Sequence, residues 1–309
     1  MAFAHLSVLA REVIEFLEPK TGKRYLDGTL GGGGHSERIL IDSSPDGQVL
    51  GLDWDEEALA AARNRLSGFG ARIITRRASF TAAAEILAEI NWPSIDGAVL
   101  DLGVSSHQLD TPQRGFSFRL SDRLDMRMDR RQSLDAFEIV NSYSAAQLER
   151  ILKTYGEERR ARRIAAAIIA RRSQRSIEST GELAELIAGV KGRSAGERHP
   201  ATLSFQALRI AVNQELDHLK QFLDRGYELF SPGARLVVIS FHSLEDRLVK
   251  AAFRKWSRDC LCPPRAPVCT CGWRRKAKVL TSRPVVASAA ECQTNPRARA
   301  AKLRAVERV

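Results

Sequence analysis

The sequence predicts an α/β protein with a mainly parallel sheet and a mostly helical insertion. Three observations support this: apolar runs ending in an acid alternate with helical segments up to residue 101, a glycine-rich loop follows the first run, and the alternation breaks between residues 111 and 205. Such alternation is typical of a parallel sheet covered by helices on both faces. At 309 residues the chain also exceeds the usual size of one compact core, which favours a large insertion or a second domain.

The first part of the chain supplies the alternating elements. A helix is expected over residues 8–17, where apolar residues recur at helical spacing and Ser7 can cap the start. In such sheets ligands bind beyond the carboxyl ends of the strands, and Asp27, Asp53 and Asp101 stand at three of those ends. The expected strands are 24–27, 48–53, 72–75 and 96–101, and the helices between them are 35–40, 55–66 and 82–90.

The alternation stops after residue 110 and resumes near residue 206. We therefore predict a core made of residues 1–110 and 206–309 and a mainly helical insertion domain over 111–205, which would recognise a substrate. The helices expected in the insertion are 144–153, 157–172 and 180–190. The elements expected after it are a long helix over 203–229, a turn at Pro232-Gly233, a strand over 235–240, a helix over 244–256, and strands over 278–281 and 303–308.

Basic residues concentrate outside the first 110 residues. Residues 1–110 carry 10 Lys and Arg against 16 Asp and Glu, whereas residues 111–309 carry 38 against 21. A small-molecule site in the first part and a polyanion-binding surface in the second would give this asymmetry, although basic solvated helices are also common. The sequence has neither a run of eighteen apolar residues nor a secretion signal, so we expect a cytoplasmic protein that does not enter a membrane.

Residues 27–36, Asp-Gly-Thr-Leu-Gly-Gly-Gly-Gly-His-Ser, predict a binding loop, because glycines let a ligand approach the main chain closely. Asp53, 19 residues after the last of these glycines, is spaced to grip the ribose of a dinucleotide or an adenosyl ligand. A dinucleotide fingerprint needs a sixth-position glycine, where this chain has Ser36 or Glu37, so S-adenosylmethionine is favoured. Asp27 would help hold the cationic amino-acid part or satisfy loop amides.

Several ordered motifs cover nearly the whole chain, from His5 to Arg299. They are Asp27-Gly28-Thr29 with Gly31 to His35, Leu100 to Ser106 with Gln108 to Asp110, Gly115 to Phe118, Leu124 to Asp129, His199 to Thr202, and Ser240 to Arg247. Together they closely resemble the RsmH (MraW) family, whose members methylate the exocyclic N(4) of a cytidine in the decoding region of bacterial 16S rRNA. The resemblance implies a class I S-adenosylmethionine-dependent methyltransferase fold, Rossmann-like and doubly wound, with a helical insertion domain.

The same resemblance implies a set of cofactor contacts. Phe80 would lie after the third strand, where an apolar ring can flank adenine or simply pack in the core. The cofactor would be S-adenosyl-L-methionine, and the implied contacts are Gly33, Gly34, His35, Asp53, Phe80, Asp101 and Gln108.

The reaction requires the cytosine amine to be aligned with the sulfonium methyl group. A hydrogen-bond acceptor would help, because it localises the amine lone pair and stabilises the charge that develops on nitrogen. Asp101 is expected to contact the cofactor first and to orient the amine second. Because Asp101-Leu102-Gly103-Val104 departs from the Asn/Asp/Ser-Pro-Pro-aromatic motif of many DNA amino-methyltransferases, other acceptors stay open: Asp125, Asp129, His242 and Ser243.

Substrate contacts are expected mainly in the insertion. Cytosine in paired RNA hides its amine, so the base must be unpaired or extruded and stacked. Phe116, Phe118 and Phe241 are candidates for stacking, with core packing as the alternative, and His242 is a further substrate contact. The expected partner is 16S rRNA or the small ribosomal subunit, while the oligomeric state stays open. An arginine-rich segment with an apolar face is expected to contact phosphates: Arg159, Arg160, Arg162, Arg163, Arg171, Arg172 and Arg175.

Cys260-Leu261-Cys262 and Cys269-Thr270-Cys271 form a symmetric set that could hold zinc with four thiolates. A spacing of two residues between the cysteines is commoner in such sites, and the family resemblance supplies no metal requirement. We therefore assign no metal to the predicted site, and leave open whether these cysteines bind zinc, stay free or form a disulfide.

Two other classes of protein stay open on the residues alone. A nicotinamide-dependent Rossmann oxidoreductase would explain the alternating elements and Asp53, but not the missing third glycine. A non-catalytic RNA-binding factor for ribosome assembly would explain the arginine-rich segment, but would leave the glycine loop without a role. An rRNA (cytosine-N(4)-)-methyltransferase explains all of these features together.

Overall fold

The computed structural model describes residues 7–118, 121–192, 199–263, 266 and 268–309. The chain divides into two compact units. The first, which we call the sheet unit, comprises Met1–Gly103 and Leu216–Val309, and the second, the helical unit, comprises Val104–Glu215. The helical unit thus starts earlier and ends later than the insertion predicted over 111–205.

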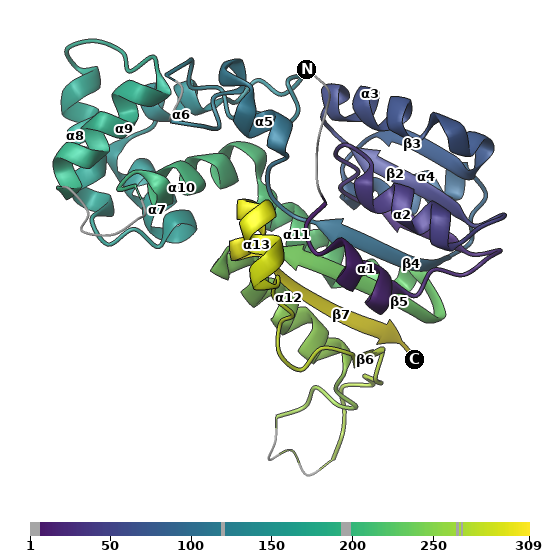
Figure 1. Ribbon diagram of the computed structural model, residues 1–309. Coiled ribbons are helices and arrows are strands. Elements are labelled where there is room, and N and C mark those ends of the chain that lie inside the picture. Colours follow the sequence, from purple (N-terminus) through teal and green to yellow (C-terminus); the bar gives the residue numbers. More distant parts are fainter. Residues whose placement is uncertain (1–6, 119–120, 193–198, 264–265, 267) are drawn as a thin grey trace. The chain divides into compact units, whose positions relative to one another are not determined.

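The sheet unit contains seven strands in the order β3-β2-β1-β4-β5-β7-β6 (Figure 1). β1 pairs in parallel with both β2 and β4, and β7 runs antiparallel to its neighbours β5 and β6. This topology confirms the predicted Rossmann-like class I fold and places the switch point, where strand order reverses, between β1 and β4. The strands are β1 (Arg24–Asp27), β2 (Gln48–Asp53), β3 (Ile73–Arg77), β4 (Ile95–Asp101), β5 (Phe230–Ser240), β6 (Ala277–Val279) and β7 (Lys302–Arg308).

Helices cover both faces of the sheet, because the two faces carry separate clusters of buried apolar side chains. One cluster joins the sheet to α1, α2 and α3, and includes Val13, Ile39 and Leu59. The other joins it to α4, α11 and α12, and includes Leu87 and Phe253. The helices of this unit are α1 (Ala10–Leu17), α2 (Gly34–Asp42), α3 (Glu56–Arg65), α4 (Ala83–Glu89), α11 (Glu215–Arg225, beginning at the boundary residue), α12 (Ser243–Trp256) and α13 (Ala289–Thr294).

Three details of the sheet unit differ from the sequence-based expectations. Leu9, rather than Ser7, precedes the first turn of α1, and no side chain caps that helix. The turn expected at Pro232-Gly233 lies inside β5, at an irregularity of its register with β4. Proline is tolerated at such irregularities because its missing N–H breaks no regular ladder. The short helix α13 was not predicted.

The single helix predicted over 203–229 is wrong. Gln214 adopts a left-handed conformation with φ 50°, so α10 (Thr202–Asn213) ends there and α11 begins at Glu215. The Asn213 side chain contributes to this break, since it accepts from the Met128 N–H and donates to the Met126 carbonyl, both in the helical unit. The apolar pattern continues across the break, which is why periodicity did not reveal it.

The helical unit has its own apolar core, formed by residues such as Ile139, Leu152, Ile164 and Leu208. α10 packs on α7, and α7 packs on α8. Ser144 caps α7 through a capping box, which explains why the sequence marked this start correctly. The helices of this unit are α5 (Ser106–Asp110), α6 (Ala136–Ser142), α7 (Ala145–Gly156), α8 (Ala161–Arg172), α9 (Thr180–Lys191) and α10.

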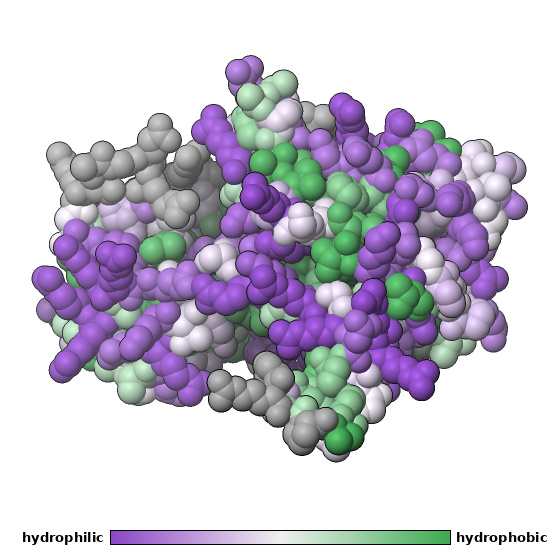
Figure 2. Space-filling view, turned by 90° about the horizontal axis from the view of Figure 1, so that it is seen from below, coloured by the Kyte–Doolittle hydropathy of each residue, from purple (hydrophilic) through white to green (hydrophobic). Residues whose placement is uncertain are grey.

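Hydrophilic side chains cover most of the face shown in Figure 2, with apolar residues in patches between them. Large apolar side chains that are exposed among the described residues are Ile41, Val268, Val286 and Val309. Within the described ranges, no helix is both long and apolar enough to span a bilayer.

Candidate active site

Three carboxylates stand at the carboxyl ends of neighbouring parallel strands, as the sequence predicted. Asp27 ends β1, Asp53 ends β2 and Asp101 ends β4. Because β1 lies between β2 and β4, the glycine loop that follows β1 emerges between the other two acids. This edge of the sheet is where open α/β sheets bind their ligands.

The glycine loop turns into α2 through Gly33. Its φ of 80° is left-handed, and a Cβ there would lie 3.1 Å from the Leu66 side chain, so both the backbone and the space require glycine. Gly34 begins α2, and His35 follows it in a buried position. The N-terminus of α2 thus faces the edge of the sheet without a side-chain cap.

Asp27 stabilises the glycine loop through two side-chain hydrogen bonds. Its Oδ1 accepts the Thr29 N–H at 3.2 Å, and its Oδ2 accepts the Ser36 hydroxyl at 2.7 Å. Burial raises the pKa of this carboxyl, against the opposing effects of His35 and Ser36. With the side chain 1% exposed, the structure favours the loop-satisfying role for Asp27 over contact with a ligand.

Asp53 lies beside the loop with both oxygens fixed by the main chain. Oδ2 accepts the Gly31 N–H at 2.8 Å and Oδ1 accepts the Asp55 N–H at 2.9 Å. Burial raises the pKa of this carboxyl to about 6, and the two N–H donors offset the effect only in part. Each oxygen keeps a further lone pair, so the carboxylate can still accept hydrogen bonds from a ligand.

His35 and Asp101 form a buried pair at the switch point. Nε2 of His35 lies 3.5 Å from Oδ2 of Asp101, an ion-pair distance without an aligned hydrogen bond. Burial lowers the pKa of His35, but the Asp101 and Asp27 carboxylates outweigh it and raise the pKa overall. Among the described residues, Oδ1 of Asp101 and both ring nitrogens of His35 have no hydrogen-bond partner.

Buried polar atoms without partners are uncommon in folded proteins, because each costs its full desolvation free energy. Here three of them lie together, on His35 and Asp101. The side chain of Asp101 is still 17% exposed although Oδ1 is buried, so a ligand can reach the carboxylate from the side of Oδ2. The pair is therefore set up to receive a polar ligand.

Two residues position this edge although sequence reasoning gave them no role. Thr29 accepts the Asp101 N–H through its hydroxyl at 2.6 Å, which ties the loop to the end of β4. Ser36, which sequence reasoning noted only because it is not glycine, donates a hydrogen bond from its hydroxyl to Asp27. The Asp-Gly-Thr motif could have indicated Thr29, and the position of Ser36 on the buried face of α2 could have indicated Ser36.

Phe80 packs against Gly28 at the start of the glycine loop. It is 6% exposed, contacts the Phe222 ring edge-on at 5.6 Å, and belongs to the apolar core. A Cβ on Gly28 would lie 2.9 Å from Cβ of Phe80 and 2.3 Å from the Leu100 side chain. Phe80 is thus a core residue that also supports the start of the glycine loop.

The remaining predicted cofactor contact, Gln108, lies in the helical unit. Its side-chain oxygen accepts the Ser105 backbone N–H at 3.0 Å, and its backbone N–H donates to the Ser105 hydroxyl. The two bonds form a capping box at the start of α5. The side chain is 4% exposed. Its capping role explains why the residue is polar and buried.

The two predicted stacking phenylalanines of the helical unit differ in burial. Phe116 is 7% exposed and packs with the Arg114 guanidinium 5.9 Å from its ring centre. Phe118 is partly exposed, stacks on His199 with ring centres 4.5 Å apart, and meets Phe205 edge-on. In this structure Phe116 is a core residue, whereas Phe118 keeps accessible surface.

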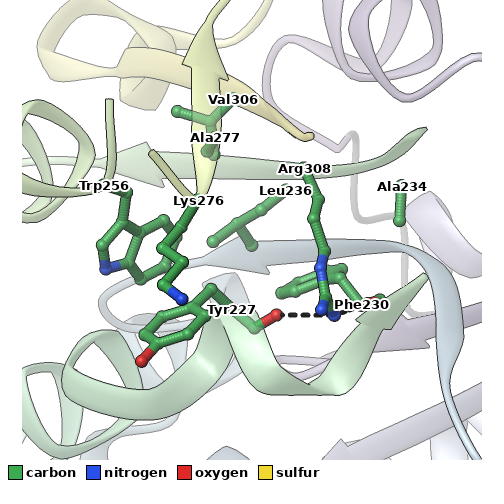
Figure 3. Close-up of a pocket in the computed structure, with 9 residues that line it drawn as sticks. All are labelled: Tyr227, Phe230, Ala234, Leu236, Trp256, Lys276, Ala277, Val306 and Arg308. Atoms are coloured by element: carbon green, nitrogen blue, oxygen red, sulfur yellow. Dashed lines mark hydrogen bonds between the residues drawn. The ribbon is translucent and has the colours of Figure 1, made fainter. Parts of the chain in front are cut away.

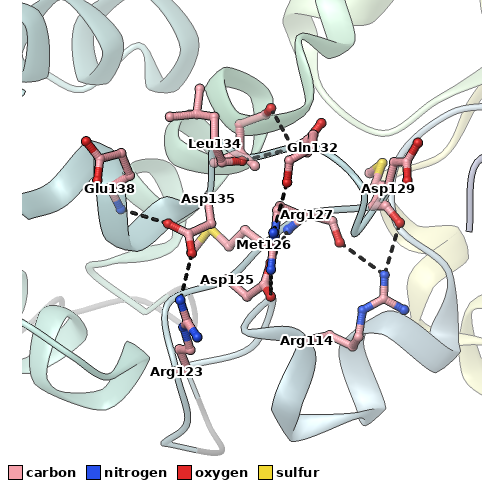
Figure 4. A network of polar contacts seen from close by, with 12 residues as sticks. Arg114, Arg123, Asp125, Met126, Arg127, Asp129, Gln132, Leu134, Asp135 and Glu138 are labelled. Carbon is pink, nitrogen blue, oxygen red and sulfur yellow. Dashed lines mark hydrogen bonds and ion pairs between the residues drawn. The ribbon is translucent and has the colours of Figure 1, made fainter.

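Asp125 and Asp129, the alternative acceptors in the helical unit, both pair with arginines, and Figure 4 shows Asp125 beside Arg127. Arg127 binds both oxygens of Asp125, at 2.7 and 2.9 Å, and Arg131 binds Asp129 at 2.7 Å. Burial would raise the pKa of Asp125, but Arg127 outweighs it and lowers the pKa. These contacts support structural roles for both acids.

His242 and Ser243, the alternatives of the sheet unit, start α12. His242 caps the helix by accepting the Glu245 N–H at Nδ1, and the Glu245 carboxylate in turn accepts the N–H groups of Phe241 and His242. Ser243 is the first residue of α12. The cap uses Nδ1 of His242, whereas Nε2 lies 3.1 Å from the Glu245 carboxylate without an aligned hydrogen bond, so the substrate contact of His242 stays a prediction.

The arginine-rich segment on and beside α8 splits into two groups. Arg160 donates to the carbonyls of Val190 and Lys191, and Arg172 donates to the carbonyl of Val140. Arg171 and Arg175 pair with Glu182. Exposed arginines without a hydrogen bond or ion pair to any other described residue are Arg159, Arg162 and Arg163. This second group remains available for an anionic partner.

Fold and site together define a class of protein, namely a Rossmann-like class I methyltransferase with an added helical unit. A glycine loop after β1 and an acid at the end of β2 are elements with which this fold holds a nucleoside ligand, and Asp101 adds a second acid at the same edge of the sheet. The chain belongs to the MraW methylase family, whose family model matches residues 2–309.

Curated relatives agree with this membership over almost the full chain. The protein from Trichlorobacter lovleyi is 52% identical over 309 residues, covering 99% of each chain. That from Oleidesulfovibrio alaskensis is 52% identical over 310 residues, covering 99% of this chain and 95% of the relative. That from Heliobacterium modesticaldum is 49% identical over 312 residues, covering all of both. Each is named ribosomal RNA small subunit methyltransferase H.

Proposed function

We propose that this protein transfers a methyl group from S-adenosylmethionine to the exocyclic N(4) amine of one cytidine in the decoding region of 16S rRNA. Membership of the MraW methylase family and relatives named for small subunit rRNA support the enzyme class and the substrate. The observation that carries the site is the carboxylate of Asp101 at the carboxyl end of β4, which is 17% exposed and has an oxygen without a hydrogen-bond partner among the described residues.

The residues around the glycine loop fit S-adenosylmethionine. Asp53 is a carboxylate with spare lone pairs beside a close main-chain loop, which suits the two hydroxyls of a ribose. Gly33 and Gly34 leave room for the side chains of Leu66 and Ser7, which lets the N-terminus of α2 pack closely at this edge and offer its uncapped N–H groups to the ligand. When bound, the cofactor supplies an electrophilic methyl group on a sulfonium centre.

Asp101 would orient the cytosine amine. Its accessible oxygen, Oδ2, would accept a hydrogen bond from the amine N–H, which localises the nitrogen lone pair and stabilises the charge that develops there. His35, 3.5 Å from Oδ2, limits the rotation of this carboxylate. In the reaction the carbon–sulfur bond breaks as the carbon–nitrogen bond forms, and the amine then loses one proton to Asp101 or to water.

The helical unit would contact the RNA. Arg159, Arg162 and Arg163 are exposed cations without a partner among the described residues, and phosphate contacts of this kind dominate affinity for nucleic acids. Phe118 offers a partly exposed ring on which a base can stack. Gln108 remains a proposed cofactor contact, in addition to its capping role.

Deletion of the gene, followed by mass spectrometry of 16S rRNA fragments, tests the substrate. We expect one decoding-region cytidine to lose its N(4)-methyl group and to regain it when the wild-type gene is restored, but not the Asp101→Ala variant. Unchanged methylation of every cytidine in the deletion strain would contradict the proposed substrate. Full rescue by Asp101→Ala would contradict the assigned role of Asp101 while leaving the substrate intact.

A further inference from the structure

Four cysteine sulfurs gather in the loop that joins α12 to β6. This loop, residues 257–276, leaves the sheet unit beyond Trp256 (Figure 1). The Sγ atoms of Cys260, Cys262, Cys269 and Cys271 all lie within 4.8 Å of one another. The Cys260 and Cys269 sulfurs are 3.4 Å apart, and Cys271 lies 3.7 Å from each of them.

These spacings match a tetrahedral metal site. Zinc binds thiolates at about 2.3 Å, and four such ligands at the corners of a tetrahedron are about 3.8 Å apart. The measured sulfur separations of 3.4, 3.7, 3.7 and 4.0 Å bracket that value. A disulfide would instead bring two sulfurs to about 2.05 Å, which no pair in this cluster approaches.

Backbone N–H groups also point at the sulfurs. Cys271 accepts from Leu261 at 3.3 Å, Cys260 accepts from Cys262 at 3.3 Å, and Cys262 accepts from Thr270 at 3.4 Å. Such donors stabilise negative charge on sulfur and fix the orientation of the ligands. The two Cys-x-Cys turns therefore hold their four sulfurs in place as prearranged metal ligands.

We infer that this loop binds one zinc ion through the four thiolates of Cys260, Cys262, Cys269 and Cys271. Zinc is favoured over harder ions because an all-sulfur tetrahedral set suits a soft or borderline metal. Four protein ligands leave no open position, so the site is structural rather than catalytic. Sequence spacing alone left this assignment open, and the three-dimensional convergence of the sulfurs supplies the missing observation.

The surroundings explain why the loop benefits from a metal. Three of the four cysteines are exposed, so the loop has little apolar core of its own. The Arg275–Asp259 ion pair at 2.8 Å joins the two ends of the loop, and the Lys276 N–H donates to the Trp256 carbonyl at the end of α12. The Lys276 ammonium lies 5.6 Å from the ring centre of Tyr227 (Figure 3). Zinc would hold the part of the loop that carries the four cysteines.

Metal analysis of the purified, fully reduced full-length protein tests the inference. We expect one zinc per chain from cells grown with zinc, and loss of that zinc in Cys269→Ser and Cys271→Ser. Cys292→Ser is the matched control, because Cys292 lies on α13 outside the cluster, and it should retain one zinc. Cobalt added to zinc-free protein should give the intense visible and near-ultraviolet bands of tetrahedral thiolate coordination.

Two further measurements keep the test independent of folding and of enzyme activity. Thiol titration without denaturant should find one reactive cysteine with zinc bound and five after chelation, since the sequence contains five. Absence of bound zinc together with a featureless cobalt spectrum of the reduced wild-type protein would overturn the proposal. An intact mass showing two lost hydrogens per cysteine pair in protein freshly isolated from cytosol would also overturn it, in favour of disulfides.

Discussion

Nε2 of His35 lies 3.5 Å from Oδ2 of Asp101, and the other oxygen of that carboxylate has no partner among the described residues. Oδ1 is buried, so Oδ2, which lies beside a residue of α2, is the oxygen that a ligand can reach at the end of β4. A carboxylate held in this way can accept a hydrogen bond without first breaking one. The proposed role of Asp101 depends on this arrangement.

Asp101→Asn should lower the rate of methyl transfer by at least about 100-fold, because the amide loses the negative charge that stabilises the reacting amine. Cofactor affinity should change less than the rate, since the Asp101 N–H keeps its bond to Thr29. Asp96→Asn, near the opposite end of β4, is the control and should leave the rate unchanged. Single-turnover kinetics with saturating RNA measure the effect, and equal losses in both variants would contradict the assignment.

Cofactor affinity should weaken as pH falls through about 6, because burial raises the pKa of Asp53 to about 6 and its ionised form accepts the ribose hydroxyls. The same pKa shift has the opposite effect on the stability of the folded protein, which rises as pH falls. A folded pKa above the ordinary 3.8 means that ionised Asp53 destabilises the ligand-free protein at neutral pH, and this penalty disappears between about pH 6 and 4. Calorimetric titration with S-adenosylhomocysteine from pH 5 to 8 tests the first effect, which Asp53→Asn should flatten.

Gly28→Ala should destabilise the sheet unit by about 1–3 kcal/mol, because the new Cβ would lie 2.3 Å from Leu100 and 2.9 Å from Phe80. Movement of Phe80 should also displace the start of the glycine loop and weaken cofactor binding. Gly68→Ala is the control, since a Cβ there meets nothing within 4 Å. Urea unfolding gives the free energies, and an unperturbed Gly28→Ala protein would show that the loop tolerates the added methyl group.

Replacing Arg159, Arg162 and Arg163 together by alanine should weaken RNA binding and reduce the slope of log affinity against log salt by about 0.7–0.9 for each lost phosphate contact. Thermal stability should change little, because these side chains are exposed. Arg172→Ala should instead lower thermal stability and leave RNA binding nearly unchanged, since the Arg172 guanidinium donates to the Val140 carbonyl and joins α8 to α6. Binding curves at several salt concentrations, paired with melting curves, separate the two classes of arginine.

Much of the sheet unit could be predicted because its signals are local. Apolar runs ending in Asp27, Asp53 and Asp101 mark strands, and the residues between them carry helical periodicity. The glycine loop is equally visible, since Gly33 has to adopt a left-handed backbone. The break at Gln214 was missed because the Asn213 side chain that helps form it binds backbone groups more than eighty residues away.

For the candidate site, the sequence by itself determined which residues stand at the strand ends, the spacing of the loop and the family to which the chain belongs. Only the tertiary structure decided how the polar groups are used. It assigned Asp27 to loop amides and a hydroxyl, Asp125 to Arg127, and left Oδ1 of Asp101 without a partner. The physical reason is that hydrogen bonds and burial depend on atoms brought together from distant segments, whereas periodicity and backbone preference are properties of neighbouring residues.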